Sequence, residues 1–163
     1  MDRVSTDPRG KIRAEHLERT AYVYVRQSSL RQVREHRESG HRQYALADWA
    51  ASAGWSQDRI VVLDEDQGKS SATPGTRDGF ERLASAVGRG EVGIVIALEV
   101  TRLARNSPDW HHLLYMCRWT DTLIADEQTI YDATVTADRI VLGIRGQIAE
   151  LELEHSIPRM VEA

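Results

Sequence analysis

The sequence predicts an α/β domain with a mostly parallel sheet of four to five strands, helices on both faces of the sheet and a long C-terminal helix. Three observations support this prediction. Short apolar runs alternate with helical patterns along most of the 163 residues. The runs are apolar on both faces, as expected of strands buried in a parallel sheet. A single apolar stripe runs along the last helical segment for roughly five turns.

The short apolar runs place the strands at residues 20–26, 60–63, 94–98 and 122–125. Residues 29–40 are dense in charge and predict a solvated loop or an exposed helix, and the polar residues 64–76 predict a loop. Three helical stripes recur at i, i+3, i+4 and i+7. They consist of Leu46, Trp49, Ala50 and Ala53, then Phe80, Leu83, Ala84 and Val87, and then Trp110, Leu113, Leu114 and Cys117.

The predicted organisation is one domain with short ends. Residues 1–19 lack apolar periodicity and are expected to be an N-terminal tail or a frayed helix, followed by the domain at residues 20–137. Residues 138–157 form the long helix, whose stripe is Ile140, Ile144, Ile148 and Leu151. Its far end has little to pack on, so we expect it to contact a partner chain, with fraying as the alternative. Residues 158–163, beginning at Pro158, are expected to be a tail.

Composition excludes several classes of protein. Apolar residues make up 41% and charged residues 28% of the chain, which are globular values. The one cysteine, Cys117, can form no internal disulfide and lacks partners for a structural zinc site. The apolar runs are too short to span a membrane and no signal-peptide pattern opens the chain, which favours a soluble, cytoplasmic protein without a membrane partner.

The charge of the chain is uneven. The net charge is −4, but residues 1–42 carry a balance of +4 and the rest a balance of −8. This bulk charge argues against stand-alone DNA binding. Nearly all of the basic residues are arginine, whose planar fork suits phosphate, although a GC-rich coding sequence explains the bias equally well.

Polar side chains follow each of the first three predicted strands. Because the carboxyl ends of parallel strands meet at one edge of a sheet, we expect them to gather there. No phosphate-binding GxxxxGK[ST] loop, GxSxG elbow or HExxH zinc pair is present. The residues at the strand ends are Tyr24, Arg26, Ser28 and Gln32, then Asp66, Ser70 and Arg77, and then Thr101, Arg102 and Arg105.

This set resembles the serine site-specific recombinases, the resolvase/invertase family that includes the large serine integrases. The resemblance covers residues 20 to about 157 and depends on YxRxS followed by Gln, the polar DxxxS loop with an Arg after it, and RLxR. The wider context resembles a transposon- or phage-associated branch of that family. The resemblance implies DNA strand exchange through a covalent 5′-phosphoserine, by dimers and tetramers. It implies no metal, and rejoining needs no ATP or other cofactor because the phosphoserine conserves the bond energy.

The resemblance also implies roles for particular residues. Ser28 matches the nucleophile, with the adjacent Ser29 as a competitor that the motif spacing disfavours. The arginines Arg26, Arg77, Arg102 and Arg105 match groups that stabilise charge on the phosphate. The supporting residues are Tyr24, Gln32, Gln43, Asp66, Ser70 and Thr101. Departures are Thr101, where many members carry Asp, Ser71, where Gly is usual, and Arg159, which follows a proline.

The sequence leaves several alternatives open. No C-terminal DNA-binding module follows the long helix within these residues, so double-stranded DNA is expected to bind weakly, and self-association is expected through residues 138–157. The first alternative is a non-catalytic remnant that pairs with full-length recombinases and regulates them. The second is a small phosphoesterase on a similar sheet. Integration, resolution and inversion are not distinguished, nor is the DNA site.

Overall fold

The structure is a computed structural model that describes residues 10–24, 36–63, 78–104 and 107–162, with the backbone alone at residues 36–43, 78, 102 and 153–162. One sheet contains five strands in the order β2-β1-β3-β4-β5. β2, β1, β3 and β4 are parallel to one another, and β5 is antiparallel to β4. The strands are β1 (Thr20–Tyr24), β2 (Ile60–Leu63), β3 (Val92–Ile96), β4 (Leu123–Ala125) and β5 (Ile130–Asp132).

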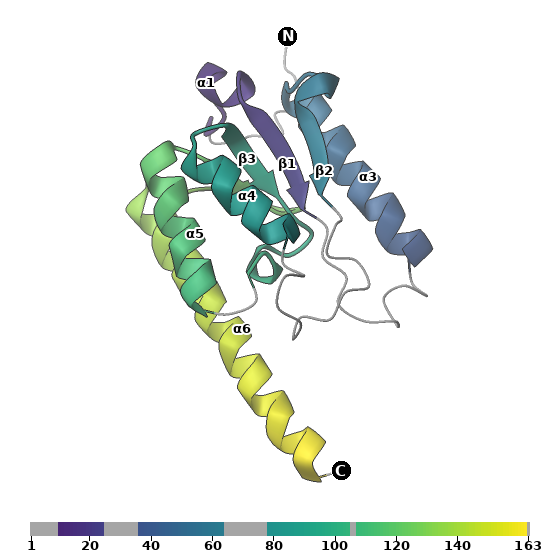
Figure 1. The fold of residues 1–163 in the computed structure, drawn as a ribbon, viewed down its shortest axis with the longest axis vertical. Coiled ribbons are helices and arrows are strands. Elements are labelled where there is room, and N and C mark those ends of the chain that lie inside the picture. Colours follow the sequence, from purple (N-terminus) through teal and green to yellow (C-terminus); the bar gives the residue numbers. More distant parts are fainter. Residues whose placement is uncertain (1–9, 25–35, 64–77, 105–106, 163) are drawn as a thin grey trace.

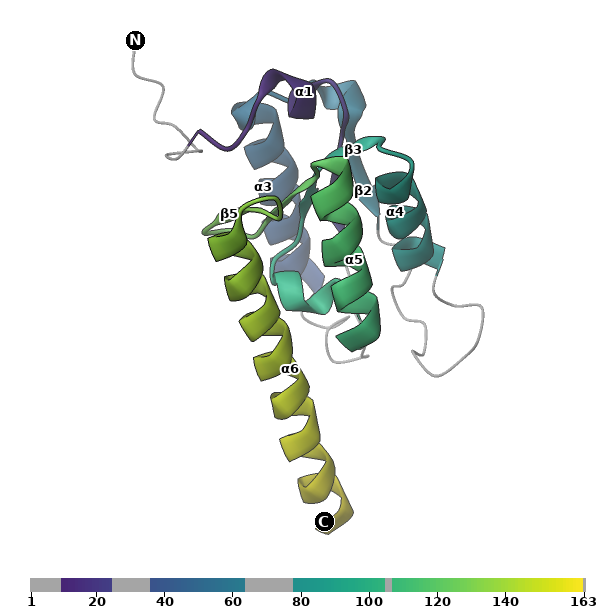
Figure 2. The same ribbon diagram turned by 90° about the vertical axis from the view of Figure 1, so that its left-hand side faces the viewer.

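Helices cover both faces of the sheet (Figures 1 and 2). On one face α3 (His36–Ala53) packs Leu46 and Ala50 against Val23 and Ile94. On the other face lie α4 (Asp78–Gly88) and α5 (Ser107–Thr120), which share a second core with the next residue of β3, Val95. Successive side chains of a strand point to opposite faces, so the fully buried β3 contributes to both cores. The predicted α/β class, with a mostly parallel sheet between helices, is confirmed.

The long C-terminal helix α6 (Thr136–Glu162) projects beyond the rest of the chain (Figure 1). It begins two residues earlier and ends five residues later than the predicted 138–157, because Pro158 does not end it. A proline removes one backbone hydrogen bond from a helix. The other backbone hydrogen bonds of α6 keep the chain helical on both sides of Pro158. No helix in the described ranges is long and apolar enough to cross a lipid bilayer.

Residues 10–19 correct the prediction of a tail or a frayed helix at residues 1–19, of which residues 1–9 lie outside the described part, because they pack into the core. They contain the short helix α1 (Ala14–Leu17), in which His16 is fully buried. Ile12 and Leu17 pack against the core on the α3 side of the sheet. The partners of these side chains lie far along the chain, so no local periodicity reveals that they are buried.

Candidate functional site

The carboxyl ends of β1, β2 and β3 lie at one edge of the sheet. Tyr24, the last residue of β1, is paired with Leu63, the last residue of β2. On the other side of β1, Val23 is paired with Ile96, the last residue of β3. Neighbouring strands lie about 5 Å apart. The three segments that carry the predicted site residues therefore leave the sheet from adjacent positions on this carboxyl edge.

Most of the predicted side chains lie outside the described residues. Tyr24 is described and is buried in the core on the α4 and α5 side of the sheet. Thr101 is described, and the backbone places Arg102 in the turn after β3 and Gln43 in α3. The predicted residues outside the described ranges are Arg26, Ser28, Gln32, Asp66, Ser70, Arg77 and Arg105, together with Ser29 and Ser71.

The turn that carries Arg102 is fixed by apolar side chains. It is the 3₁₀ helix η2 (Val100–Arg102), in which Leu103 N–H donates to the Val100 carbonyl at 3.1 Å. Val100, Leu103 and Ala104 are all buried. The Leu and Ala of the RLAR sequence therefore anchor the turn in the core, and the arginine is held at the carboxyl edge by this packing.

A hollow of about 440 Å³ lies beside this turn. The loop after β3, the β4–β5 turn and α6 line it, and its residues are Leu98, Glu99, Thr101, Asp126, Glu127, Gln128, Arg145, Ile148, Ala149 and Glu152. The Thr101 hydroxyl donates to Glu99 Oε1 at 3.3 Å. The sequence analysis did not identify this hollow, because its lining comes from three segments far apart in the chain.

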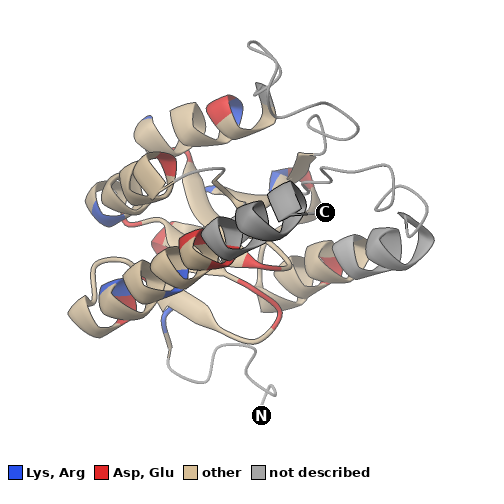
Figure 3. Cartoon of the chain, turned by 90° about the horizontal axis from the view of Figure 1, so that it is seen from below, with Lys and Arg blue, Asp and Glu red and all other residues tan. Residues whose placement is uncertain are grey.

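The chemistry of the hollow is set by an excess of carboxylates. Arg145 Nη1 lies 2.9 Å from Asp126 Oδ2, while Asp126 Oδ1 accepts the N–H groups of Gln128 and Thr129 at 2.9 and 2.8 Å. Glu99, Glu127 and Glu152 add three further carboxylates. Figure 3 shows acidic positions beside α6 in the view from below. The carboxylates that line the hollow repel phosphate.

One arginine–aromatic contact extends this arrangement. The Arg145 guanidinium lies 5.5 Å from the centre of the Tyr131 ring, within the range of a cation–π contact. Burial raises the pKa of Tyr131, and the positive charge of Arg145 opposes that shift. Tyr131 is therefore a neutral side chain that holds Arg145 against the β4–β5 turn. Within the described ranges, no group of three or more His, Cys, Asp or Glu side chains could hold a metal ion.

Comparison with known proteins identifies the family. The family described as "Resolvase, N terminal domain" matches residues 21–163, and the chain belongs to this family. The chain is 51% identical over 150 residues to the uncharacterized protein y4bA/y4pH of Sinorhizobium fredii. That match covers 92% of this chain and 22% of the relative, so the chain spans about a fifth of the length of the relative.

One solved structure, with a TM-score above 0.5, shares the fold. A resolvase family site-specific recombinase from Streptococcus pneumoniae has a TM-score of 0.56 and 23% identity, over 88% of this chain and 94% of that chain. The N-terminal catalytic domain of TP901-1 integrase has a TM-score of 0.44 and 17% identity, over 83% of this chain and 98% of that chain. The predicted resemblance to the resolvase/invertase family is confirmed.

Proposed function

We propose that this chain is the catalytic domain of a serine site-specific DNA recombinase in which Ser28 is the nucleophile. The observation that carries the proposal is the shared carboxyl edge of β1, β2 and β3. Ser28 lies four residues after Tyr24, and Asp66 lies three residues after Leu63, which is paired with Tyr24. Arg102 lies six residues after Ile96 in a turn anchored by buried Val100 and Leu103.

The proposed reaction is an exchange of one phosphodiester for another. The Ser28 oxygen bonds to the phosphorus and loses its proton, while the bond from phosphorus to the 3′-oxygen breaks and that oxygen takes up a proton. The enzyme then holds the 5′-phosphate, and attack by a 3′-hydroxyl reverses the step. Negative charge grows on the non-bridging oxygens, and guanidinium groups stabilise it through bidentate bonds. Arg26, Arg77, Arg102 and Arg105 fill this role in the proposal.

Self-association through α6 is the second part of the proposal. Ile140, Ile144, Ile148 and Leu151 are each 50–57% exposed, although they are the apolar stripe of this helix. The helix contacts the domain mainly through another face, where Leu142 is fully buried, and Ile148 at the border of the stripe also lines the hollow. An apolar stripe exposed along a projecting helix suits a second copy of the same helix, because pairing removes it from water.

A suicide DNA substrate tests the nucleophile. The chain, fused to a DNA-binding module whose site flanks the cleavage point, is expected to form a covalent adduct with the 5′ end of the cut strand. Ser28→Ala is expected to abolish the adduct, and the matched variant Ser29→Ala to retain it. An adduct that survives in Ser28→Ala, or free phosphate released without any adduct, overturns the assignment of Ser28.

Solution mass tests the pairing. The double variant Ile144→Glu/Ile148→Glu places two charges in the stripe, whereas Gln147→Glu adds one charge at an exposed polar position of the same helix. We expect sedimentation to show self-association for the unchanged chain and for Gln147→Glu, and a monomer for the double variant. A monomer in all three contradicts the pairing. Pairing together with an absent adduct favours the non-catalytic regulatory partner instead.

A further inference from the structure

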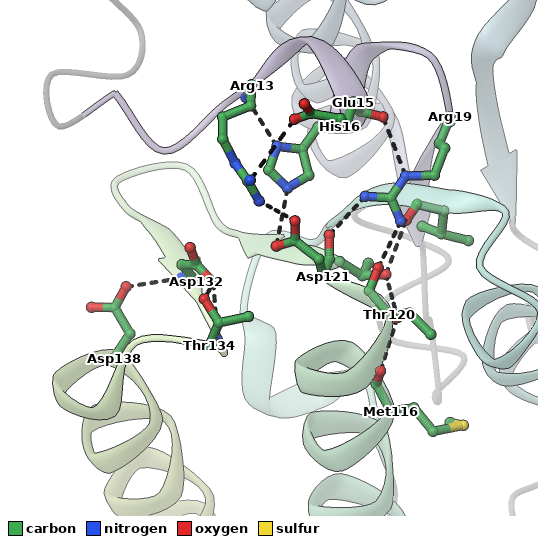
Figure 4. Close-up of polar contacts among 12 residues, drawn as sticks. Arg13, Glu15, His16, Arg19, Met116, Thr120, Asp121, Asp132, Thr134 and Asp138 are labelled. Carbon is green, nitrogen blue, oxygen red and sulfur yellow. Dashed lines mark hydrogen bonds and ion pairs between the residues drawn. The ribbon is translucent and has the colours of Figure 1, made fainter.

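Residues 10–19, which we call the strap, lie at the end of the sheet opposite the carboxyl edge (Figure 1), and Figure 4 shows their polar contacts with Asp121 and Thr120. The strap lies before residue 21, where the match to the resolvase family begins. The Arg19 guanidinium fixes one end of the strap by donating to three carbonyls, those of Val92 at 2.9 Å and of Thr120 and Asp121 at 2.8 Å each. The strap is thereby attached to β3 and to the end of α5.

The middle of the strap is fixed by His16. Its Nδ1 accepts the backbone N–H of Arg13 at 2.9 Å, and its carbonyl accepts the indole N–H of Trp55 at 3.0 Å. The Asp121 carboxylate lies 3.4 Å from His16 Nε2 and also pairs with the Arg13 guanidinium. A Cβ on Gly93 would lie only 2.1 Å from the His16 carbonyl oxygen, so the strap crosses β3 where glycine alone leaves room.

The start of the strap is attached to the first turn of α6. Lys11 Nζ donates to Asp138 Oδ2 at 2.8 Å and to the Ile130 carbonyl at 2.7 Å. The Lys11 and Asp138 side chains are only 12% and 10% exposed. Asp138 Oδ2 also accepts the backbone N–H of Asp132 at 2.8 Å. Lys11, β5 and the first turn of α6 therefore form one hydrogen-bonded unit.

A second attachment of α6 to the domain lies farther along the helix. Trp110 Nε1 donates to the Leu142 carbonyl at 3.1 Å, and a Cβ on Gly146 would lie 2.4 Å from the Trp110 ring. The Arg145–Asp126 pair holds α6 to the β4–β5 turn beside this contact, so the direction of the helix axis depends on these contacts together with the one at its first turn. From Gly146 to the end of α6 the helix extends about 24 Å, so a tilt of about 10° displaces its far end by about 4 Å.

We propose that the strap is a latch on α6, in which the Lys11–Asp138 ion pair sets the direction of the helix and thereby the geometry in which two copies pair. This inference rests on the proposed pairing through the α6 stripe. Without the ion pair, the helix keeps its attachments at Trp110, at the buried Leu142 and at the Arg145–Asp126 pair, and its first turn is no longer held to the strap. The strap lies before the region matched by the family, so the family match does not include this contact.

The double variant Lys11→Met/Asp138→Asn removes the latch. Removing one partner of a buried ion pair leaves the other charge buried without a partner. Replacing both residues leaves no uncompensated charge, so the double variant is expected to fold. Lys11→Arg keeps the cation and is the expected rescue. Arg89→Met is the matched control, because it breaks the Arg89–Glu91 pair at a position where both side chains are more than half exposed.

The readout is the distance distribution between spin labels at exposed positions 118 on α5 and 150 on α6, with self-association measured in parallel. We expect the double variant to broaden the distribution and to weaken pairing severalfold, and Lys11→Arg and Arg89→Met to resemble the unchanged chain. An unchanged distribution and an unchanged pairing constant in the folded double variant overturn the latch. If the unchanged chain does not pair, the proposed pairing fails, and the label distances still decide whether the ion pair directs α6.

Discussion

The contact between α5 and α6 predicts different effects of substitution at two glycines of α6, Gly143 and Gly146. A Cβ added at Gly146 would lie 2.4 Å from Trp110 Cδ1 and Nε1, whereas a Cβ added at Gly143 meets nothing within 4 Å. Trp110 is buried in the core and cannot swing away freely. Replacing either glycine with alanine brings the same gain in helix propensity, up to about 1 kcal/mol. The difference between the two variants therefore isolates the cost of the clash.

That cost follows from overpacking of a core. Forcing one extra methyl group into a packed site costs about 1–3 kcal/mol. For a chain of this size, each kcal/mol shifts Tm by about 2–4 °C. We expect Gly146→Ala to melt about 6 °C below Gly143→Ala, with Gly143→Ala at or above the unchanged protein, as followed by circular dichroism at 222 nm. Equal melting temperatures for the two variants would refute the close contact between Trp110 and Gly146.

Two further predictions concern buried titratable groups. Burial lowers the pKa of His16, against the opposing charge of Asp121, so the unfolded chain binds the proton more tightly and the free energy of unfolding should fall as the pH drops below about 6.5. Urea titrations at pH 7.5 and 5.5 measure how much free energy of unfolding each protein loses at the lower pH. His16→Asn should lose less than the unchanged protein, and an equal loss in both proteins contradicts this role of His16. Burial raises the pKa of Cys117 to about 12, so its thiol should react with Ellman's reagent at pH 8 only after unfolding in guanidinium. Full reaction within minutes in the native protein contradicts the burial of Cys117.

The strands and helices were largely predictable, because each has its own local periodicity. The strand at residues 60–63 is β2 without change, while the run at residues 94–98 is shifted by two residues from β3. The short β5 was not located, since three residues carry too little pattern. The stripe of α6 was predicted as an apolar face, and its expected contact with a partner stays a prediction.

The candidate site was predictable in one respect and not in another. The order of the motifs after successive strands places them at one edge of the sheet, and the parallel pairing of β1 with β2 and β3 confirms that those strands end together. The convergence of the arginines on Ser28 lies outside the described residues and stays a prediction. The acidic hollow could not be predicted, because Glu99, Asp126 and Arg145 come from separate segments.

The sequence by itself determined the α/β class, the membership of the resolvase family and the identity of the proposed catalytic groups, because periodicity, composition and short motifs are properties of neighbouring residues. Only the tertiary structure decided that residues 10–19 belong to the domain and that the apolar stripe of α6 is left half exposed. Lys11 and Asp138 are 127 residues apart in sequence. A contact across that separation depends on how the whole sheet and its helices pack, and no local pattern encodes it.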